Sequence, residues 1–429
     1  MLLQFTIQNF KSFRDRQVFS MLADADAEHA PGLVAELPVG RVLRAAALYG
    51  ANASGKSTFV EAWNVLVTLV RDGVRPDQAL PWFPSFFAAD TENTELAFEA
   101  WAGGAHWAYG IVYNAHRVEE EWLVRYEGGD SKTWFHRAAG NERPLVEWGA
   151  ASPSDRRAFL EHVAEGTRNE QPLLAELRER GVEEAASIAT LILRLARGER
   201  LLRRSGDHLI VSPDELEALV YSLWFPEIKQ ELEARLRVLA TGVERVRIVG
   251  AEGEVRGPTG HLGFAELMER VKAEQLHLEF AHQDGAGGEQ WFRWSDLSTG
   301  TQRAARDASL WLLDVQVIDE LDRSLHTSAA RALVERHLAR ARGQLIFTTH
   351  DTNLLDGELL SPDAVWFVRK DGSGSSRLYS LLDFAPDDLE TLRREGGLEE
   401  AYLEGRFGAV PFASSRARTQ ARWPETSAG

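Results

Sequence analysis

The stretch LYGANASGKST, residues 48–58, contains the complete pattern G-x-x-x-x-G-K-[ST] from Gly50 to Ser57. In this pattern the glycines let backbone amides turn inward toward phosphate groups. A short apolar run precedes the loop, and residues 56–73 follow with apolar residues at helical spacing and a final glycine. The order strand, glycine loop, helix is the one that phosphate binding requires. This context favours a phosphate loop over a chance match in a glycine-rich turn.

The phosphate loop predicts which residues hold a nucleotide and its metal. We expect the Lys56 ammonium to reach the β- and γ-phosphates, and the Ser57 hydroxyl to bind Mg²⁺. The predicted nucleotide-binding residues are Gly50, Asn52, Ser54, Gly55, Lys56, Ser57 and Thr58.

A second motif, VQVIDE at residues 315–320, is an apolar strand that ends in two carboxylates. We expect Asp319 to hold Mg²⁺, directly or through water, and Glu320 to polarise an attacking water molecule. Two acidic residues after a strand often do no more than solvate its end. Their occurrence in a chain with a phosphate loop favours the catalytic interpretation.

The segment LSTGTQ, residues 297–302, lies just before the acidic strand. Ser298 and Gly300 open a predicted helix and offer a hydroxyl, free amides and the positive end of the helix dipole. This arrangement predicts a second anion-binding helix N-terminus. A simple capping serine is the alternative for these residues.

Three further polar residues follow buried-looking strands. His350 ends the strand QLIFTTH, and we expect it to contact the γ-phosphate and position the water; a capping histidine is the alternative. Asp322, in the loop after the acidic pair, is predicted to communicate with a neighbouring subunit. His326 shares that loop, and a structural role is at least as well supported for it.

The rest of the chain predicts an α/β fold whose parts differ in pattern. Residues 80–150 alternate and carry glycine turns, which is typical of antiparallel strands, whereas residues 153–240 are helical. The predicted parts are an N-terminal lobe over 1–150, a helical insertion over 151–245, a C-terminal lobe over 246–412 and a disordered tail over 413–429. A hairpin over 363–384 and a helix over 387–405 close the second lobe.

The composition narrows the class of protein. The 429 residues contain no cysteine, which removes disulfides, thiolate catalysis and cysteine-ligated zinc, and the net charge of −17 repels nucleic acid. No window approaches the ~18 apolar residues of a membrane span, so a cytoplasmic protein with no membrane contact is expected.

Basic residues at two places leave a nucleic-acid contact open. Lys11 and Arg14 could touch nucleotide phosphate or DNA, or lie in a solvated loop. A basic run could be a solvated helix face or a contact with DNA or an acidic partner. This run consists of Arg194, Arg197, Arg200, Arg203 and Arg204.

Together the motifs resemble the ABC class of ATPases, in the order phosphate loop, signature, acidic strand, D-loop and switch histidine. The resemblance implies a Mg²⁺-dependent ATPase with an ABC-ATPase head: a mixed sheet with flanking helices, an antiparallel β subdomain and a compact helical insertion. It implies an ATP-sandwich homodimer or higher homo-oligomer, in which Ser298, Gly300 and Gln302 act in trans. It also makes Asp322 the D-loop residue and Lys56, Glu320 and His350 the catalytic residues.

Within that class, IQNFKSF at residues 7–13 followed by GANASGKS resembles the branch of SMC, RecF and OLD-type proteins. FTTHDTNLLD and the segment AYLEGRFGAVPF resemble the ATPase subunits of two-gene anti-phage systems, including the PARIS type. This resemblance covers roughly residues 1–110 and 285–412. It implies a sensor subunit that controls a separate toxin or nuclease effector, for which a Toprim protein is one candidate, with a phage protein or DNA as trigger.

Two departures and two alternatives remain. No residue between 75 and 100 can be assigned as the Q-loop glutamine, and no E…DxD cluster follows His350, so no nuclease activity is expected in this chain. A DNA-clamping repair ATPase of the RecF or SMC type is the main alternative. A transporter subunit is the other, although LSTGTQ departs from the transporter signature.

Overall fold

The computed structural model describes most of the chain, and its described residues are 1–76, 78–86, 92–140, 143–182, 223, 226–239, 241–250, 253–255, 276–284, 287–298, 300–302, 305, 315–323, 326–340, 343–384 and 397–409. These residues fall into two compact units. The first consists of residues 1–199, 313–322 and 334–429, and the second of residues 200–312 and 323–333.

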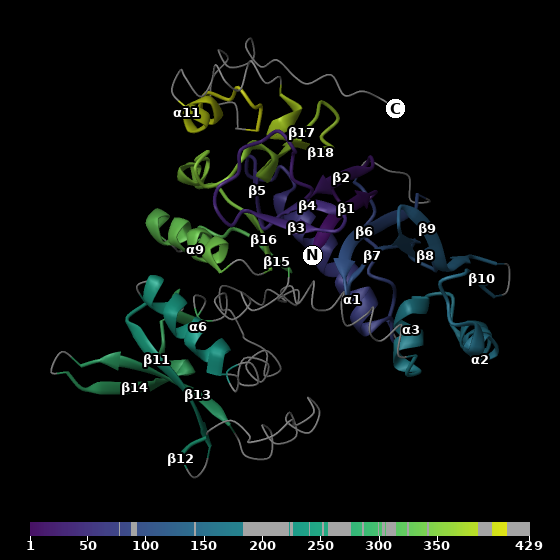
Figure 1. Ribbon diagram of the computed structural model, residues 1–429, viewed down its shortest axis with the longest axis horizontal. Helices are drawn as coiled ribbons and strands as arrows, with labels where there is room; N and C mark the ends of the chain where they lie inside the picture. The colour runs from purple at the N-terminus through teal and green to yellow at the C-terminus, as the bar shows by residue number, and fades with distance from the viewer. Residues whose placement is uncertain are drawn as a thin grey trace. The chain divides into compact units, whose positions relative to one another are not determined.

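A five-stranded mixed sheet forms the centre of the first unit (Figure 1). Its strand order is β15-β16-β5-β17-β18; the first four strands are parallel and β18 is antiparallel to β17. The strands are β15 (Val315–Ile318), β16 (Gln344–Thr348), β5 (Ala45–Tyr49), β17 (Val365–Lys370) and β18 (Ser376–Ser380). β5 is buried along its whole length, as expected of an apolar strand with a neighbour on each side.

An antiparallel sheet with the order β10-β9-β8-β7-β6-β1-β2 forms the other layer of the first unit. Its strands are β1 (Leu2–Gln8), β2 (Gln17–Ser20), β6 (Thr94–Ala102), β7 (Ala105–Tyr113), β8 (Val118–Glu127), β9 (Asp130–Ala138) and β10 (Leu145–Trp148). Phe5 of β1 meets Phe59 and Trp63 of helix α1 (Lys56–Asp72) edge-on, at 5.5 and 5.1 Å between ring centroids. These aromatic contacts fix α1 against this sheet.

Short elements complete the first unit. A two-stranded hairpin pairs β3 (Val34–Leu37) with β4 (Gly40–Leu43), and the sequence analysis did not predict it because each strand has only four residues. The helices are α2 (Arg157–Gly166), α3 (Leu173–Glu179) and α11 (Gly397–Leu403). The 3-10 helices are η1 (Ser154–Arg156), η3 (Thr352–Leu354), η4 (Pro362–Ala364) and η5 (Leu381–Asp383). Helix α9 (Thr327–Ala339) follows the acidic strand in sequence.

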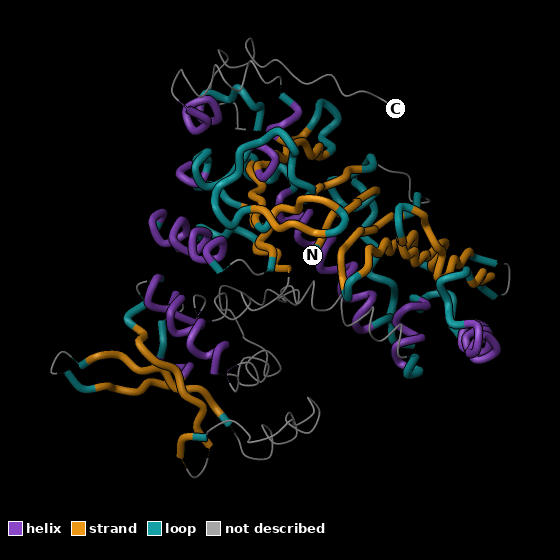
Figure 2. The backbone as a smooth tube through the Cα atoms, viewed as in Figure 1, coloured by secondary structure: helices purple, strands orange, loops and turns teal. Residues whose placement is uncertain are grey.

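In the described residues, the second unit contains a four-stranded antiparallel sheet with a helix against it (Figure 2). Its strands, in the order β12-β11-β13-β14, are β12 (Gly253–Glu254), β11 (Val243–Gly250), β13 (His277–Gln283) and β14 (Glu289–Arg293). The 3-10 helix η2 (Trp294–Asp296) follows β14.

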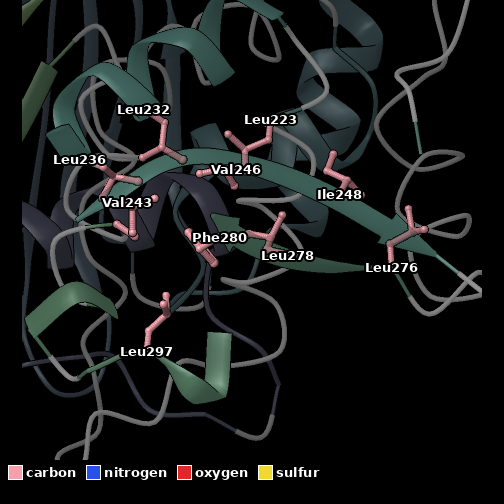
Figure 3. Packing of buried hydrophobic residues seen from close by; sticks show 11 residues of the cluster. Leu223, Leu232, Leu236, Val243, Val246, Ile248, Leu276, Leu278, Phe280 and Leu297 are labelled. Carbon is pink, nitrogen blue, oxygen red and sulfur yellow. The ribbon is translucent and has the colours of Figure 1, made fainter. Parts of the chain in front are cut away.

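The core of this unit lies between the sheet and helix α6 (Pro226–Val238). Leu232 and Leu236 of α6 point toward Val246 and Phe280 of the sheet, and all four are at most 1% exposed (Figure 3). Burial of such side chains contributes about 1.5–3 kcal/mol each.

The predicted α/β fold with a mixed sheet and an antiparallel subdomain is confirmed. Within the predicted helical segment, α2 and α3 lie in the first unit and α6 in the second. The predicted parts 1–150, 151–245 and 246–412 are a different division and stay a prediction. The basic run at 194–204, most of the predicted helix at 387–405 and the tail lie outside the described residues. None of the helices in the described part combines the length and hydropathy of a transmembrane span.

Candidate active site

The loop after β5 is shaped by close packing at its two outer glycines. A Cβ on Gly50 would lie 2.3 Å from the Val368 carbonyl oxygen, and one on Gly55 would lie 2.4 Å from Ser376 Oγ. Gly55 also has a φ of +122°, a conformation that L side chains rarely adopt. Both positions therefore require glycine, and the glycines of the motif serve the path of the loop itself.

Two serines, Ser376 and Ser12, support the loop through hydrogen bonds, and neither was predicted from the sequence. Ser376, at the start of β18, places its Oγ 2.5 Å from the Ser54 carbonyl oxygen and 2.8 Å from Ser12 Oγ. Ser12 Oγ in turn lies 3.4 Å from Thr58 Oγ1 on the first turn of α1. The segment around Ser12 and the β17–β18 turn thus hold both the loop and the start of the helix. The only sequence signal was the position of Ser12 in KSF before the loop.

Lys56 begins α1 and lies across the loop. Its Nζ donates to the carbonyl oxygens of Gly50 and Ala51 at 2.7 and 3.1 Å. Burial lowers the Lys56 pKa to about 8, although Asp319 and Glu320 oppose that shift. No carboxylate among the described residues forms an ion pair with Lys56. Its direct contacts there are the two loop carbonyls, and Asp319 and Glu320 act on its charge without an ion pair.

Two other groups at this loop can donate hydrogen bonds: the Ser54 hydroxyl and the backbone amides at the N-terminus of α1. The Ser54 hydroxyl is buried, and no described residue hydrogen-bonds to it. Within the described structure, no side chain caps the α1 N-terminus, and its first turn contains no acidic residue. An uncapped helix N-terminus favours an anion, because its amides and the helix dipole both attract negative charge. Asn52 and Ser57, by contrast, are exposed at the surface of the loop.

The two carboxylates after β15 are held by one hydroxyl on the neighbouring strand. Thr348 Oγ1, at the end of β16, donates to Asp319 Oδ1 at 2.6 Å and accepts from the Glu320 backbone amide at 2.7 Å. Glu320 has a φ of +52°, which is uncommon for a residue with a side chain. The fully buried Thr348 therefore fixes the acidic pair in a strained turn, and sequence reasoning did not identify it.

His350 follows β16, and its backbone amide donates to the Asp322 carboxylate at 3.3 Å. Burial and the nearby Lys56 lower the pKa of His350, although Asp322 and Glu320 oppose that shift. Asp322 thus contacts the residue after β16 within its own chain. The parallel order β15-β16-β5 brings the acidic pair, the histidine and the phosphate loop to the carboxyl edge of one sheet.

The LSTGTQ residues lie in the second unit. Ser298 Oγ accepts from the Thr301 amide at 3.1 Å and lies 2.9 Å from Thr301 Oγ1, so Ser298 caps a helical turn. Ser298 and Gly300 are exposed, and Gln302 donates through Nε2 to the Trp294 carbonyl oxygen at 2.7 Å.

The weaker candidates have local partners. His326 Nδ1 accepts from the Ser328 amide at 3.3 Å near the start of α9, which is a capping arrangement. The Lys11 ammonium forms an ion pair with Glu61 at 2.6 Å, and the Arg14 amide donates to Ser375 Oγ at 3.2 Å.

Comparison with known proteins places the chain in a broader context. The family model described as "AAA domain, putative AbiEii toxin, Type IV TA system" matches residues 45–356. That range, almost three quarters of the chain, includes the phosphate loop, the acidic strand and His350. No curated protein matches the sequence.

Three of the solved structures similar to the chain are heads of SMC proteins. An SMC head bound to the C-terminal winged-helix domain of ScpA shares 12% identity, covers 91% of this chain and 99% of its own, and gives a TM-score of 0.40. The SMC head domain from Thermotoga maritima shares 14% identity over 88% of this chain and 98% of its own, with a TM-score of 0.37. An SMC head with an extended coiled coil, bound to the C-terminal domain of ScpA from Pyrococcus furiosus, shares 13% identity over 91% and 99%, with a TM-score of 0.39.

Proposed function

Because this chain belongs to the AAA family whose model matches residues 45–356, and hence to the ATPases, we propose that it hydrolyses ATP at the loop after β5 and that its nucleotide state controls a separate effector. One observation carries the proposal: a buried lysine, an unpartnered buried serine hydroxyl and an uncapped helix N-terminus surround a single loop. All three favour a multiply charged anion such as a triphosphate.

Each residue of the site has a chemical task in this proposal. Lys56 exchanges the Gly50 and Ala51 carbonyls for phosphate oxygens and stabilises the charge that develops during transfer. Glu320, in its strained turn, accepts a proton from the attacking water. His350 lies at the same sheet edge and orients that water against the γ-phosphate.

The donor set suits Mg²⁺. Ser57 offers a hydroxyl and Asp319 a carboxylate, and these hard oxygen ligands would hold Mg²⁺ together with water and phosphate oxygens. When bound, Mg²⁺ supplies charge neutralisation at the phosphates. In the described part of the chain, no three His, Cys, Asp or Glu residues form a metal site of their own. Protein ligands as few as two are usual for Mg²⁺ held with a nucleotide.

A second copy of the chain is proposed to complete the site. Ser298 and Gly300 are exposed at the start of a helical turn, where amides and a hydroxyl can meet a phosphate. We propose that two chains enclose ATP between them, with Ser298, Gly300 and Gln302 acting on the nucleotide of the partner and Asp322 at the D-loop position.

The biological role is proposed from the description of the family, which refers to a toxin of a type IV toxin–antitoxin system. In an anti-phage system, closure of the dimer by ATP would hold or release a toxin or nuclease, and a phage protein or DNA would act as trigger. The net charge of −17 supports control of a protein partner over general binding to DNA.

The variant Glu320→Gln tests the chemistry. The amide cannot accept the proton, so kcat for phosphate release is expected to fall about 10²–10⁴-fold, while the affinity for ATP is retained. The exposed Glu358→Gln is the matched control and should hydrolyse ATP at the normal rate.

Light scattering of Glu320→Gln with Mg²⁺ and ATP tests the assembly, since trapped ATP should give a stable dimer. Normal hydrolysis by this variant would contradict the role of Glu320, and a monomer under these conditions would contradict the ATP sandwich. Binding of duplex DNA that weakens steeply with salt would favour a DNA-clamping ATPase of the RecF or SMC type instead.

A further inference from the structure

The chain after residue 396 has no part in the function proposed above, yet residues 397–409 pack against the phosphate loop. Helix α11 and the turn that follows it bury Leu398, Ala401, Tyr402, Phe407 and Ala409 in the first unit. Figure 1 shows α11 on the side of β17, next to β5 in the sheet order.

Tyr402 makes the contact at the phosphate loop. Its ring meets Tyr49, the last residue of β5, at 5.5 Å between centroids, and lies parallel to Phe367 of β17 at 6.0 Å. Burial raises the Tyr402 pKa to about 12, and the backbone amide of Gly50 opposes that shift. Tyr402 therefore packs on the residue that immediately precedes the phosphate loop.

The same helix makes a second contact with the 3-10 helix η3, which begins two residues after His350. Glu399 accepts a short hydrogen bond from the Thr352 hydroxyl, two residues after His350. The Tyr49 hydroxyl donates to the Asp351 carbonyl oxygen at 3.3 Å, which links the ends of the two strands. One helical turn thus connects the base of the phosphate loop with the segment after His350.

The turn after α11 is anchored from the other side. Phe407 stacks on Phe367 at 5.1 Å, and its carbonyl oxygen accepts from the Tyr379 hydroxyl. Phe367 lies in the parallel part of the sheet beside β5, so the anchor is part of the rigid core. Movement of the loop is consequently resisted by packing that reaches the sheet.

We propose that Tyr402 is a positioning residue for the phosphate loop and that residues 397–409 form a C-terminal brace, which couples this loop to the segment after His350. The inference rests on the proposed nucleotide site. By holding Gly50 in place before ATP arrives, the brace reduces the ordering that ATP binding must impose. Because coupling between two sites is reciprocal, ATP in turn stabilises the brace.

The variant Tyr402→Leu tests the brace, since it removes the ring that packs on Tyr49 and keeps an apolar side chain. Loss of one aromatic contact should raise the Kd for ATP and the KM about 3- to 10-fold, while kcat stays unchanged. Leu403→Ala is the matched control, because Leu403 follows Tyr402 on the same helix and is exposed. It should leave Kd and KM at the wild-type values.

A second pair of variants and an exchange measurement separate positioning from general stability. Glu399→Ala should raise the KM like Tyr402→Leu, whereas its exposed neighbour Glu400→Ala should not. Hydrogen exchange in wild-type protein should slow within residues 397–409 when Mg²⁺ and ATP are added.

The outcomes for the brace and for the nucleotide site are distinct. Equal KM values for wild type and Tyr402→Leu, equal KM increases in Tyr402→Leu and Leu403→Ala, or unchanged exchange in residues 397–409, would overturn the brace. If wild-type protein fails to bind ATP, the proposed function fails instead.

Discussion

Two buried cations of the first unit, Arg137 and Lys56, differ in the groups that compensate their charge. Arg137 on β9 lies 3.5 Å from the Glu121 carboxylate and donates to the carbonyl oxygens of Gln171, Arg168 and Asn169 at 2.5, 3.1 and 3.2 Å. Lys56 has only two carbonyls of its own loop. Arg137 forms an ion pair with its counter-charge, whereas Lys56 forms none among the described residues and is influenced by Asp319 and Glu320 without direct contact.

The Glu121 carboxylate also accepts hydrogen bonds from several groups. It accepts from the amides of Leu173 and Leu174 at the start of α3, at 2.6 and 3.0 Å, and from the Tyr109 hydroxyl at 3.0 Å. Burial raises the pKa of Glu121, and Arg137 and these amides oppose the shift. The pair therefore ties α3 to the antiparallel sheet.

This difference distinguishes a buried charge that stabilises the fold from a buried charge that binds a ligand. A buried charge that serves the fold has its partners in the fold, because an uncompensated buried charge is costly. A buried lysine that forms no ion pair is expected to gain its counter-charge from a ligand. This applies where a hydroxyl and a helix N-terminus beside it also have no partner among the described residues. In this chain the phosphate loop has the second character.

The largest expected effect is on stability, at the structural pair. Arg137→Met leaves Glu121 buried without its cation and should lower the free energy of unfolding by about 3–5 kcal/mol, measured by urea denaturation. Lys132→Met on the same strand removes an exposed ion pair with Glu127 and should leave the free energy of unfolding nearly unchanged, because water and salt screen exposed ion pairs. Equal losses in the free energy of unfolding for Arg137→Met and Lys132→Met would contradict this distinction.

The next effect is on binding, at the loop. Lys56→Met should change the free energy of unfolding without nucleotide by no more than about 1 kcal/mol, because it also removes the desolvation of an unpaired charge. It should weaken ATP binding about 10- to 100-fold, as expected for a lost charge-assisted hydrogen bond. A variant that unfolds far more readily but binds ATP normally would make Lys56 a structural cation like Arg137.

The sequence predicted the loop side of this comparison well. The motif at residues 48–58, the acidic strand and the histidine strand all occur where they were expected, because each motif is contiguous and its strand is apolar throughout. The α/β class followed from the same alternation of strands and helix.

The supporting residues could not be predicted, because their partners are distant in sequence. Thr348 reaches the carboxylate of Asp319, and Ser376 reaches Ser12 across 364 positions. Glu121 and Arg137 sit in strands whose alternation indicates only which face they share. Such contacts depend on strand order and register, which local patterns do not specify.

Proton uptake on ATP binding tests most directly whether phosphate completes the charge of Lys56. With a Lys56 pKa of about 8, most of these side chains are neutral at pH 8.5–9 in the free protein. A bound triphosphate raises that pKa, so binding should take up a proton and affinity should fall as pH rises above 8. The His350 pKa is lowered from 6.5, so His350→Gln should leave the uptake at pH 8.5–9 unchanged.

The measurement is titration calorimetry of wild-type protein with Mg²⁺ and ATP at pH 8.5–9, in two buffers of different ionisation enthalpy. We expect the apparent binding enthalpy to differ between the buffers by an amount that corresponds to uptake of about half a proton to one proton per ATP. Tight ATP binding with the same enthalpy in both buffers would contradict the account, because Lys56 would then be charged before the phosphates arrive.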